Sequence, residues 1–348
     1  MEAADSLRAD VARDARLLAA ALGHDPVQGR RVLVTGANGF VGHHLARAWR
    51  DSGDVMIGVG LDRPDDLLDE GALEAWQPCD VTDPAETTRM LRTFGPDVIV
   101  HLAGQASAGR SFEDPLGTYR TNALGTASVL EGVRHEARTA RVLVVGTSES
   151  YGPQPPGSRV AEDVPLAPVS PYALSKAAAD SIAEFYARAH GLHVIRTRSF
   201  HHIGSGQAPH LAIPGFASQI AAMERGRSAP TLRVGNLDVI RDVTHVRDVV
   251  DAYHLLIERG RPGVAYNVCR GEGTRLSEIV HGLCERAKVP VRIEVDVTRI
   301  RPADVPYLVG DPARIHGETG WRATRTLDAS LDEVLEEWRR KVPMPAPG

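Results

Sequence analysis

The chain of 348 residues carries a formal net charge of -5 and has no basic block, which disfavours nucleic acid and an anionic membrane surface as partners. With 43% hydrophobic and 24% charged residues, its composition is typical of a globular enzyme of one large domain or two smaller ones. The sequence has no apolar run long enough to span a bilayer and no signal pattern at its N-terminus. The three cysteines, Cys79, Cys269 and Cys284, are isolated from one another, so we expect a reducing, cytoplasmic environment.

Residues 1–29 are predicted to form an N-terminal extension. Apolar residues recur among arginines and aspartates from Asp5 to Leu22, which indicates a helix, and Gly23 ends it. We expect this helix to pack on the surface or on a partner subunit, and we assign no chemistry to it.

A glycine-rich turn between a strand and a helix is the first sign of a nucleotide site. The β-branched run Arg31–Thr35 predicts a buried strand, and His43–Arg50 predicts a helix. The glycines between them, Gly36, Gly39 and Gly42, are spaced G-x-x-G-x-x-G. Glycine lets the backbone approach a pyrophosphate, and a helix N-terminus supplies free N–H groups and a positive dipole end. Strand, turn and helix in this order predict a dinucleotide-binding unit.

The next two strands end at acidic residues. Val55–Gly60 predicts the second strand, and Asp62 follows at 62 − 42 = 20 residues after the last glycine. An acid at that distance would hydrogen-bond the adenosine ribose hydroxyls of NAD, whereas the neighbouring Arg63 could meet the 2′-phosphate of NADP. The alternative is that Asp62 is only a turn residue before the following proline. Asp80–Val81 ends a third short strand, where an acid can reach the adenine amino group.

Strands and helices continue to alternate along the chain. Val98–Gly104 predicts a fourth strand that runs into small residues, and Arg141–Val145 predicts a fifth that ends at Thr147–Glu149. Asp114–Glu136 and Tyr172–His190 predict long helices. This alternation predicts an α/β fold, a parallel sheet with helices on both faces, in which ligands bind at the carboxyl ends of the strands.

Tyr172 and Lys176 form the strongest candidate for chemistry. Their spacing of four residues places both side chains on one face of a helix. A free phenol titrates near ~10, and a nearby ammonium favours the phenolate, so the pair can move a proton on or off a substrate oxygen. With 7 tyrosines and three lysines, the expected number of accidental pairs at this spacing is about 7 × 3/348, or ~0.06. The alternative is a solvated helix face with a half-buried tyrosine.

Several motifs together resemble the extended short-chain dehydrogenases/reductases, the NAD-dependent epimerase/dehydratase family, that modify nucleotide sugars. The matching stretches are Thr35–Gly42, His101–Gly104, Thr147–Gly152 and Tyr172-x-x-x-Lys176, and the resemblance covers about residues 30–340. Within the family, the chain looks most like GDP-4-keto-6-deoxy-mannose reductases and next like GDP-mannose 4,6-dehydratases. That likeness rests on Arg198–Gln207, Val234–Leu237, Arg241–Asp242, Tyr266–Cys269, Arg301–Pro306 and Thr319–Trp321.

The resemblance implies a Rossmann doubly wound parallel sheet with a smaller α/β substrate domain. The Rossmann domain would comprise residues 30–202, with 239–269 returning to it. The nucleotide-sugar domain would comprise 203–238 and 270–340, followed by a tail at 341–348. The family also implies a homodimer or a larger even assembly, in which two long helices of each subunit pair into a four-helix bundle.

The resemblance further implies roles for individual residues. Tyr172 would be the acid/base, Lys176 would hold the nicotinamide ribose and tune the tyrosine, and Thr147 would hydrogen-bond the sugar oxygen. In the dehydratases, a glutamate at the place of Glu149 takes the C5 proton. The implied site for NAD or NADP consists of Gly36, Asn38, Gly39, Phe40, Val41, Gly42, Asp62, Asp80, Val81, Leu102, Ala103, Gly104, Tyr172, Lys176 and His202. The implied substrate site consists of Gln105, Ser107, Ser148, Glu149, His201, Arg241 and Arg301, with the two arginines clamping the diphosphate.

Two positions depart from the family pattern. This chain has His201 where family members carry Asn at the diphosphate, and Ala106 where they carry Ser near the hexose. A histidine can still donate one N–H, whereas an alanine cannot, so the sugar or its orientation would differ from the GDP-mannose series. The pairs His43–His44 and His201–His202 are adjacent rather than four residues apart, so no metal site is expected.

The predicted activity is the NAD(P)-dependent reduction of the 4-keto group of a nucleotide-linked 6-deoxy-hexose, with GDP as the expected nucleotide. The alternative is a 4,6-dehydratase or an epimerase that recycles its cofactor internally, and a remote alternative is a non-catalytic dinucleotide-sensing module. Glu149 does not separate reductase from dehydratase, because both keep a glutamate there. Ile203–Gln207 and Val305–Leu308 look like the reductase branch, whereas Asp62 weakly favours the dehydratase, because a recycled cofactor is often NAD.

Overall fold

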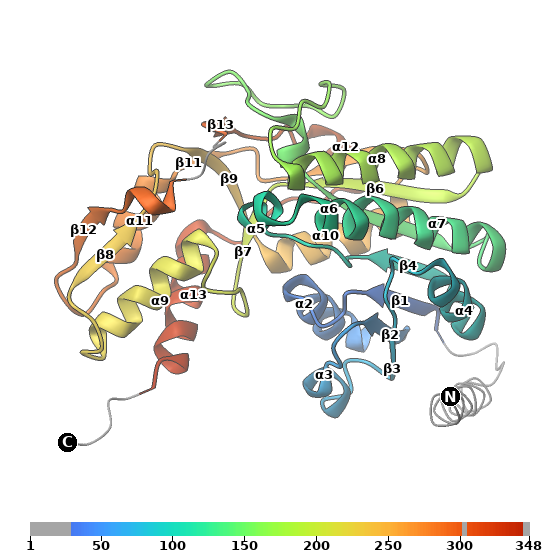
Figure 1. Ribbon diagram of the computed structural model, residues 1–348, viewed down its shortest axis with the longest axis horizontal. Helices are drawn as coiled ribbons and strands as arrows, with labels where there is room; N and C mark the ends of the chain where they lie inside the picture. The colour runs from blue at the N-terminus through green and yellow to red at the C-terminus, as the bar shows by residue number, and fades with distance from the viewer. Residues whose placement is uncertain (1–28, 301–304, 344–348) are drawn as a thin grey trace.

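A seven-stranded parallel sheet organises the larger part of the molecule (Figure 1). The computed structural model describes residues 29–300 and 305–343, so the helix predicted over Asp5–Leu22 lies outside the described residues. The strand order reverses between β1 and β4, and this reversal is the point at which doubly wound sheets bind ligands. From one edge to the other the strands are β10 (Ala265–Val268), β6 (His193–Ser199), β5 (Arg141–Thr147), β4 (Val98–His101), β1 (Arg31–Thr35), β2 (Val55–Gly60) and β3 (Ala75–Pro78).

Helices cover both faces of this sheet, which explains why its strands are apolar runs rather than alternating ones. One face is packed by α2 (Phe40–Trp49) and α10 (Val246–Arg259), and the other by α4 (Pro84–Phe94), α7 (Gly125–Glu136) and α8 (Pro171–His190). Shorter helices complete this part of the chain: α3 (Asp65–Asp69), α5 (Ala108–Glu113), α6 (Pro115–Tyr119) and α12 (Ala313–Thr319). Figure 1 shows α7 and α8 running side by side.

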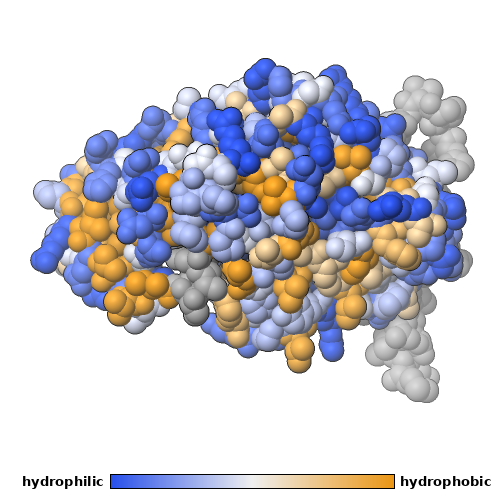
Figure 2. Space-filling view, turned by 90° about the horizontal axis from the view of Figure 1, so that it is seen from above, coloured by the Kyte–Doolittle hydropathy of each residue, from blue (hydrophilic) through white to orange (hydrophobic). Residues whose placement is uncertain are grey.

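A second, smaller part of the molecule has its own core. Its helices are α9 (Ala212–Glu224), α11 (Leu276–Glu285) and α13 (Leu327–Lys341), which pack around apolar residues such as Phe216, Leu283 and Leu335. Its strands form two small sheets: β7 (His201–Ile203), β9 (Ile240–His245), β11 (Gly273–Arg275) and β13 (Tyr307–Leu308) in one, and β8 (Thr231–Val234) with β12 (Arg292–Val295) in the other. Seen from above, the surface carries separate hydrophobic patches among hydrophilic residues (Figure 2).

The predicted fold class is confirmed, and the differences concern where elements begin and end. Helix α2 begins at Phe40 rather than at the predicted His43, because Gly39 already has the extended backbone of a helix cap. The long helix predicted over Asp114–Glu136 is interrupted by the π-helical turn η2 (Arg120–Leu124) between α6 and α7.

The chain crosses between the two parts more than once. Within the range 239–269, α10 packs on the seven-stranded sheet and β10 is its edge strand, whereas β9 lies in the second part. The division into domains therefore stays a prediction.

Two further observations concern the described residues as a set. None of their helices combines the length and the apolar character that a membrane span requires. They also contain no group of three or more His, Cys, Asp or Glu side chains arranged to hold a metal ion.

Candidate active site

The turn between β1 and α2 is shaped to hold a phosphate group. Gly36 has a φ of +70°, and a Cβ there would lie 2.9 Å from the Ala103 Cα, so this backbone has no room for a side chain. A Cβ on Gly42 would collide with the Ala37 carbonyl oxygen. Helix α2 starts after Gly39 with no side chain capping it, so its first N–H groups remain open to a ligand. These features fit the diphosphate of a dinucleotide cofactor.

Two exposed carboxylates lie where the adenosine of such a cofactor would meet the sheet. Asp62 follows β2 by two residues, and Asp80 follows the neighbouring strand β3 by two residues. The guanidinium of Arg63 is also exposed and pairs with Asp65 at 2.8 Å. The structure therefore leaves both predicted modes of binding open: the Asp62 carboxylate could bind the ribose hydroxyls of NAD, and Arg63 could bind the 2′-phosphate of NADP.

The remaining predicted cofactor residues follow β1, β3 and β4 or lie in β7. Leu102 and Ala103 follow β4 directly, and Val81 is buried next to Gly125 of α7, where a Cβ would lie 3.0 Å from the Val81 Cγ2. His202 donates from Nδ1 to the Phe200 carbonyl at 3.0 Å. Its ring is stacked on that of Phe40, with a centroid distance of 6.1 Å and an interplanar angle of 5°. Asn38 and Val41 lie in the glycine turn and at the start of α2.

Lys176 is the buried cation of the site. Helix α8 begins at Pro171, and Ser170 caps it by accepting the Ala173 N–H at 3.1 Å. This start places Lys176 in the second turn, where its Nζ donates to the Val145 carbonyl of β5 at 2.9 Å. Burial lowers the pKa of Lys176 to about 8, because a desolvated ammonium is less stable than a neutral amine. Lys176 can therefore change its charge within the pH range in which enzymes work.

Tyr172 lies one helical turn before Lys176 and faces the end of β5. Its hydroxyl is hydrogen-bonded to the side chain of Thr147. Burial and the negative charge of Glu149 raise the pKa of Tyr172, whereas the bond to Thr147 lowers it. From the sequence, the neighbouring ammonium is expected to lower this pKa; in the structure burial dominates instead, and the phenol is protonated at neutral pH. The carboxyl end of β5 thus brings together the four predicted catalytic residues.

Two residues that the sequence analysis did not single out join this cluster. Asn122, in the π-helical turn, donates from Nδ2 to the Ser175 Oγ at 2.8 Å. Ser175 in turn donates to the Tyr172 carbonyl at 2.7 Å. The available signal was weak: Ser175 stands between the two motif residues in the sequence, and Asn122 is hidden inside a helical pattern.

Gly104 lies between α8, the helix that carries Tyr172 and Lys176, and the π-helical turn, with little space on either side. A Cβ on Gly104 would lie 2.8 Å from the Asn122 Oδ1 and 3.3 Å from the Lys176 Nζ. The small residue predicted here is therefore needed to let β4 and α8 approach each other.

The predicted substrate residues Gln105, Ser107 and Ser148 lie beside this cluster. Gln105 donates from Nε2 to the Ser107 carbonyl at 2.9 Å and to the Thr118 Oγ1 at 3.1 Å. Ser148 is buried directly after β5. The loop after β4 is thereby fixed before a substrate arrives, which reduces the ordering cost of binding.

The other predicted substrate residues belong to the second part of the chain. His201 is exposed in β7, and Arg241 lies in β9, the strand that pairs with β7. Arg241 donates from Nη1 to the Ile240 carbonyl at 2.9 Å. Arg301 lies outside the described residues, so its role at the diphosphate stays a prediction, as do the roles of His201 and Arg241.

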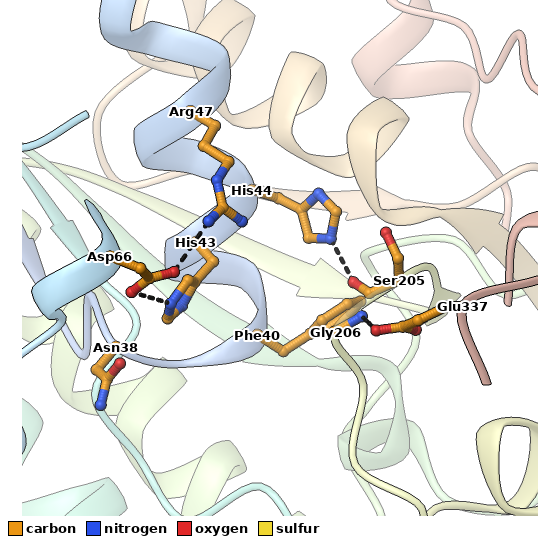
Figure 3. Close-up of a pocket in the computed structure, with 9 residues that line it drawn as sticks. All are labelled: Asn38, Phe40, His43, His44, Arg47, Asp66, Ser205, Gly206 and Glu337. Carbon is orange, nitrogen blue, oxygen red and sulfur yellow. Dashed lines mark hydrogen bonds and ion pairs between the residues drawn. The ribbon is translucent and has the colours of Figure 1, made fainter. Parts of the chain in front are cut away.

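A polar cavity of about 330 Å³ opens where α2 meets α3, α13 and the loop after β7 (Figure 3). His44 donates from Nε2 to the Ser205 carbonyl at 2.7 Å, and the Gly206 N–H donates to the Glu337 Oε1 at 2.7 Å. The cavity is lined by Asn38, Phe40, His43, His44, Arg47, Asp66, Ser205, Gly206 and Glu337. The His44 bond connects helix α2 to the loop after β7, and the Gly206 bond connects that loop to α13.

The geometry of a Rossmann sheet, a glycine turn and a Tyr–Lys pair agrees with the comparisons to known proteins. The family model described as "GDP-mannose 4,6 dehydratase" matches residues 33–334. The chain belongs to this family. The predicted membership among nucleotide-sugar short-chain dehydrogenases/reductases is therefore confirmed.

Two relatives are named for reactions of GDP-linked 6-deoxy sugars. The chain is 33% identical to a GDP-6-deoxy-D-mannose reductase of Pseudomonas aeruginosa, over 90% of this chain and 98% of that protein. It is 28% identical to a GDP-6-deoxy-D-talose 4-dehydrogenase of Aggregatibacter actinomycetemcomitans, over 88% of this chain and 96% of that protein.

Solved structures similar to this one hold both nicotinamide cofactors. The RMD protein of Pseudomonas aeruginosa, complexed with NADPH, superimposes with a TM-score of 0.77 at 32% identity, covering 90% of this chain and 100% of that chain. A UDP-glucose 4-epimerase of Thermus thermophilus, complexed with NAD, gives a TM-score of 0.80 at 27% identity over the same shares of the two chains.

Proposed function

We propose that this chain is an NAD(P)-dependent reductase of the 4-keto group of a nucleotide-linked 6-deoxy-hexose, with a GDP-linked sugar as the first candidate. The observation that carries the proposal is the 33% identity to a GDP-6-deoxy-D-mannose reductase over nearly the whole of both chains. A second relative, named for dehydrogenation at position 4 of GDP-6-deoxy-D-talose, supports the same class of substrate.

The protonation state of the site suits reduction. When bound, the nicotinamide cofactor supplies the hydride. The ketone oxygen needs a proton as the alcohol forms, and a tyrosine whose pKa is raised by burial is already in the donating form. Thr147, hydrogen-bonded to Tyr172, is placed to hold the same oxygen, and the buried Lys176 lies one turn further along α8. The roles of these residues are part of the proposal.

A dehydratase is the second candidate, because the matching family model is that of a dehydratase and Glu149 lies next to Tyr172. A reductase consumes one reduced cofactor per sugar, whereas a dehydratase consumes none. The test supplies GDP-mannose with oxidised cofactor in one tube and GDP-4-keto-6-deoxy-mannose with reduced cofactor in another, and follows both by NMR. Cofactor consumption in the second tube supports the reductase. A 4-keto-6-deoxy product in the first tube, with no consumption in the second, establishes the dehydratase, and silence in both points to a different sugar.

We further propose that the chain forms a homodimer through α5 to α8. Helices α5, α6 and α7 pack along α8, and α6, the π-helical turn and α8 expose the apolar side chains of Leu116 at 76%, Leu124 at 60% and Phe185 at 57%. Light scattering at micromolar concentration should give a dimer for the wild type and a monomer for Phe185→Arg. Val297→Arg, at an apolar residue exposed by 74% in the second part of the chain, is the matched control and should stay dimeric. A monomeric wild type refutes the proposal.

A cytoplasmic location also remains a proposal. Cys79 and Cys269 are buried without a disulfide partner, and burial raises the pKa of Cys79 to about 12, which keeps it an unreactive thiol. Cell fractionation tests it, and recovery of the protein outside the cytoplasm would contradict it.

A further inference from the structure

His101 is a buried histidine at the point where the strand order of the large sheet reverses. It is the last residue of β4 and is only 3% exposed. In the sheet it pairs with Thr35, the last residue of β1, on one side and with Val144 of β5 on the other. A titratable ring lies here at the end of β4 and within the electrostatic reach of Lys176, and the proposed chemistry does not use it.

The hydrogen bonds of His101 run in one direction. Thr126 donates its only hydroxyl proton to the Asn122 carbonyl at 2.7 Å, so its oxygen must accept from the His101 Nε2 at 3.1 Å. On the other side, the Thr35 Oγ1 accepts the Ala103 N–H at 3.1 Å and is left with its own proton for the His101 Nδ1 at 2.8 Å. The ring is therefore neutral, with its proton on Nε2.

The chain of bonds ends at the π-helical turn beside the catalytic helix. Asn122 supplies the carbonyl that terminates the chain, and its side chain holds two further groups. Its Oδ1 accepts the Gln105 N–H at 2.8 Å, and its Nδ2 reaches the Ser175 Oγ at 2.8 Å. Ser175 directly precedes Lys176 and bonds to the carbonyl of Tyr172. A shift of the π-helical turn would therefore move both the loop after β4 and the start of α8.

We propose that neutral His101 is a positioning residue for the Tyr172–Lys176 pair, acting through the one-way chain Ala103, Thr35, His101, Thr126 and Asn122. The inference rests on the proposed function, because it assigns His101 a role toward groups whose chemistry is itself proposed. His101 touches neither the sugar nor the proton that Tyr172 donates. Its part is to fix the distance between the cofactor-side strands and the catalytic helix.

Neutrality is part of this role. Among the described residues, Lys176 on α8 is the charged group whose field acts on the ring. Burial and this neighbouring cation lower the pKa of His101 to about 3, so the imidazole is uncharged at neutral pH. A proton on Nδ1 would leave the Thr35 hydroxyl without its acceptor and would place a second cation near Lys176. The Thr35 hydroxyl therefore requires an unprotonated Nδ1, and the neighbouring Lys176 disfavours a charged ring.

The first test is spectroscopic and needs no substrate. ¹⁵N NMR of the imidazole rings, with the His101 signals assigned by their loss in His101→Gln, should show a protonated Nε2 and an unprotonated Nδ1. These signals should not titrate between about pH 5.5 and 9, whereas exposed histidines titrate near ~6.5. A ring that is protonated on Nδ1, or that titrates in this range, overturns the proposal.

The second test is kinetic and has a matched control. Thr319 makes the same pair of bonds as Thr126, donating to the Ile315 carbonyl at 2.7 Å and accepting the Trp321 N–H at 3.1 Å, but it lies in α12 away from the site. Thr126→Val and Thr319→Val should lose similar stability in urea. Only Thr126→Val should lower kcat, by about tenfold, the effect of one hydrogen bond, with KM within about twofold. Thr126→Ser should restore turnover.

The outcomes separate the two proposals. Unchanged kcat in Thr126→Val, or an equal loss in Thr319→Val, refutes a positioning role. If the wild type turns over neither candidate sugar, the proposed function fails, and the NMR result still decides whether His101 holds the neutral, one-way arrangement. If Thr126→Val does not fold, the NMR measurement on the wild type still tests the tautomer on which the proposal depends.

Discussion

The sharpest prediction concerns Gly36→Ala. The residue has a φ of +70°, and a Cβ would lie 2.9 Å from the Ala103 Cα, well inside the contact distance of about 3.5–4.0 Å between carbon atoms. The left-handed backbone costs about 1 kcal/mol for alanine, and pushing a backbone out of a packed position costs about 2 more. We therefore expect Gly36→Ala to lower the free energy of unfolding by about 3 kcal/mol. Because the displaced backbone forms the phosphate turn, cofactor affinity should fall at least about tenfold.

Gly71→Ala is the matched control for this prediction. Gly71 has a φ of +69°, and nothing lies within 4 Å of the Cβ that alanine would add. It should therefore show the backbone cost alone, about 1 kcal/mol, and bind cofactor normally. Urea unfolding and calorimetric titration with NAD and NADP measure both quantities. If Gly36→Ala is as stable as Gly71→Ala and binds both cofactors like the wild type, the reasoning about the turn is wrong.

Three further predictions follow from the site. Tyr172→Phe keeps the ring but removes the proton donor, so turnover should fall by roughly 10²–10⁴ with little change in cofactor affinity; near-normal turnover would remove Tyr172 from the chemistry. Asp62 should repel a 2′-phosphate, so the wild type should prefer NAD and Asp62→Ala should lose that preference, as measured by dissociation constants; tighter NADP binding by the wild type would contradict this. Burial lowers the pKa of Lys176 to about 8, below its unfolded value near ~10.4, so the unfolded chain binds more protons between these values and stability should rise with pH there. Urea unfolding of the wild type relative to Lys176→Met from pH 7 to 10.5 should show this rise, and a constant difference would refute it.

The sequence predicted the strands better than the connections between them. Arg31–Thr35 and Val55–Gly60 have the predicted bounds, because strands buried on both faces are short apolar runs with clear ends. The start of α2 was placed three residues late, because a glycine that caps a helix looks in sequence like one more turn residue. The π-helical turn at Arg120–Leu124 was not predicted, because a single extra residue per turn leaves the helical pattern almost unchanged.

The residues of the candidate site also fall into those that a local pattern in the sequence predicted and those that it did not. Tyr172 and Lys176 were found because their spacing along one helix is itself the signal. Asn122 and the bonding of His101 were not found, because they depend on contacts between residues 25 or more positions apart, which no local pattern encodes. The raised pKa of Tyr172 was also missed, because burial cannot be weighed against a neighbouring charge before the fold is known.

The burial of Lys176 has a consequence for chemical labelling. The chain has only three lysines, and the other two, Lys288 and Lys341, are exposed. At pH 8 an amine with a pKa of about 8 is half neutral and nucleophilic, whereas an ordinary lysine is neutral to less than about 1%. The most reactive of the three lysine side chains is thus also the least accessible of them. An amine-directed reagent small enough to enter the site would report on ligand occupancy through Lys176, with the two exposed lysines as reference signals.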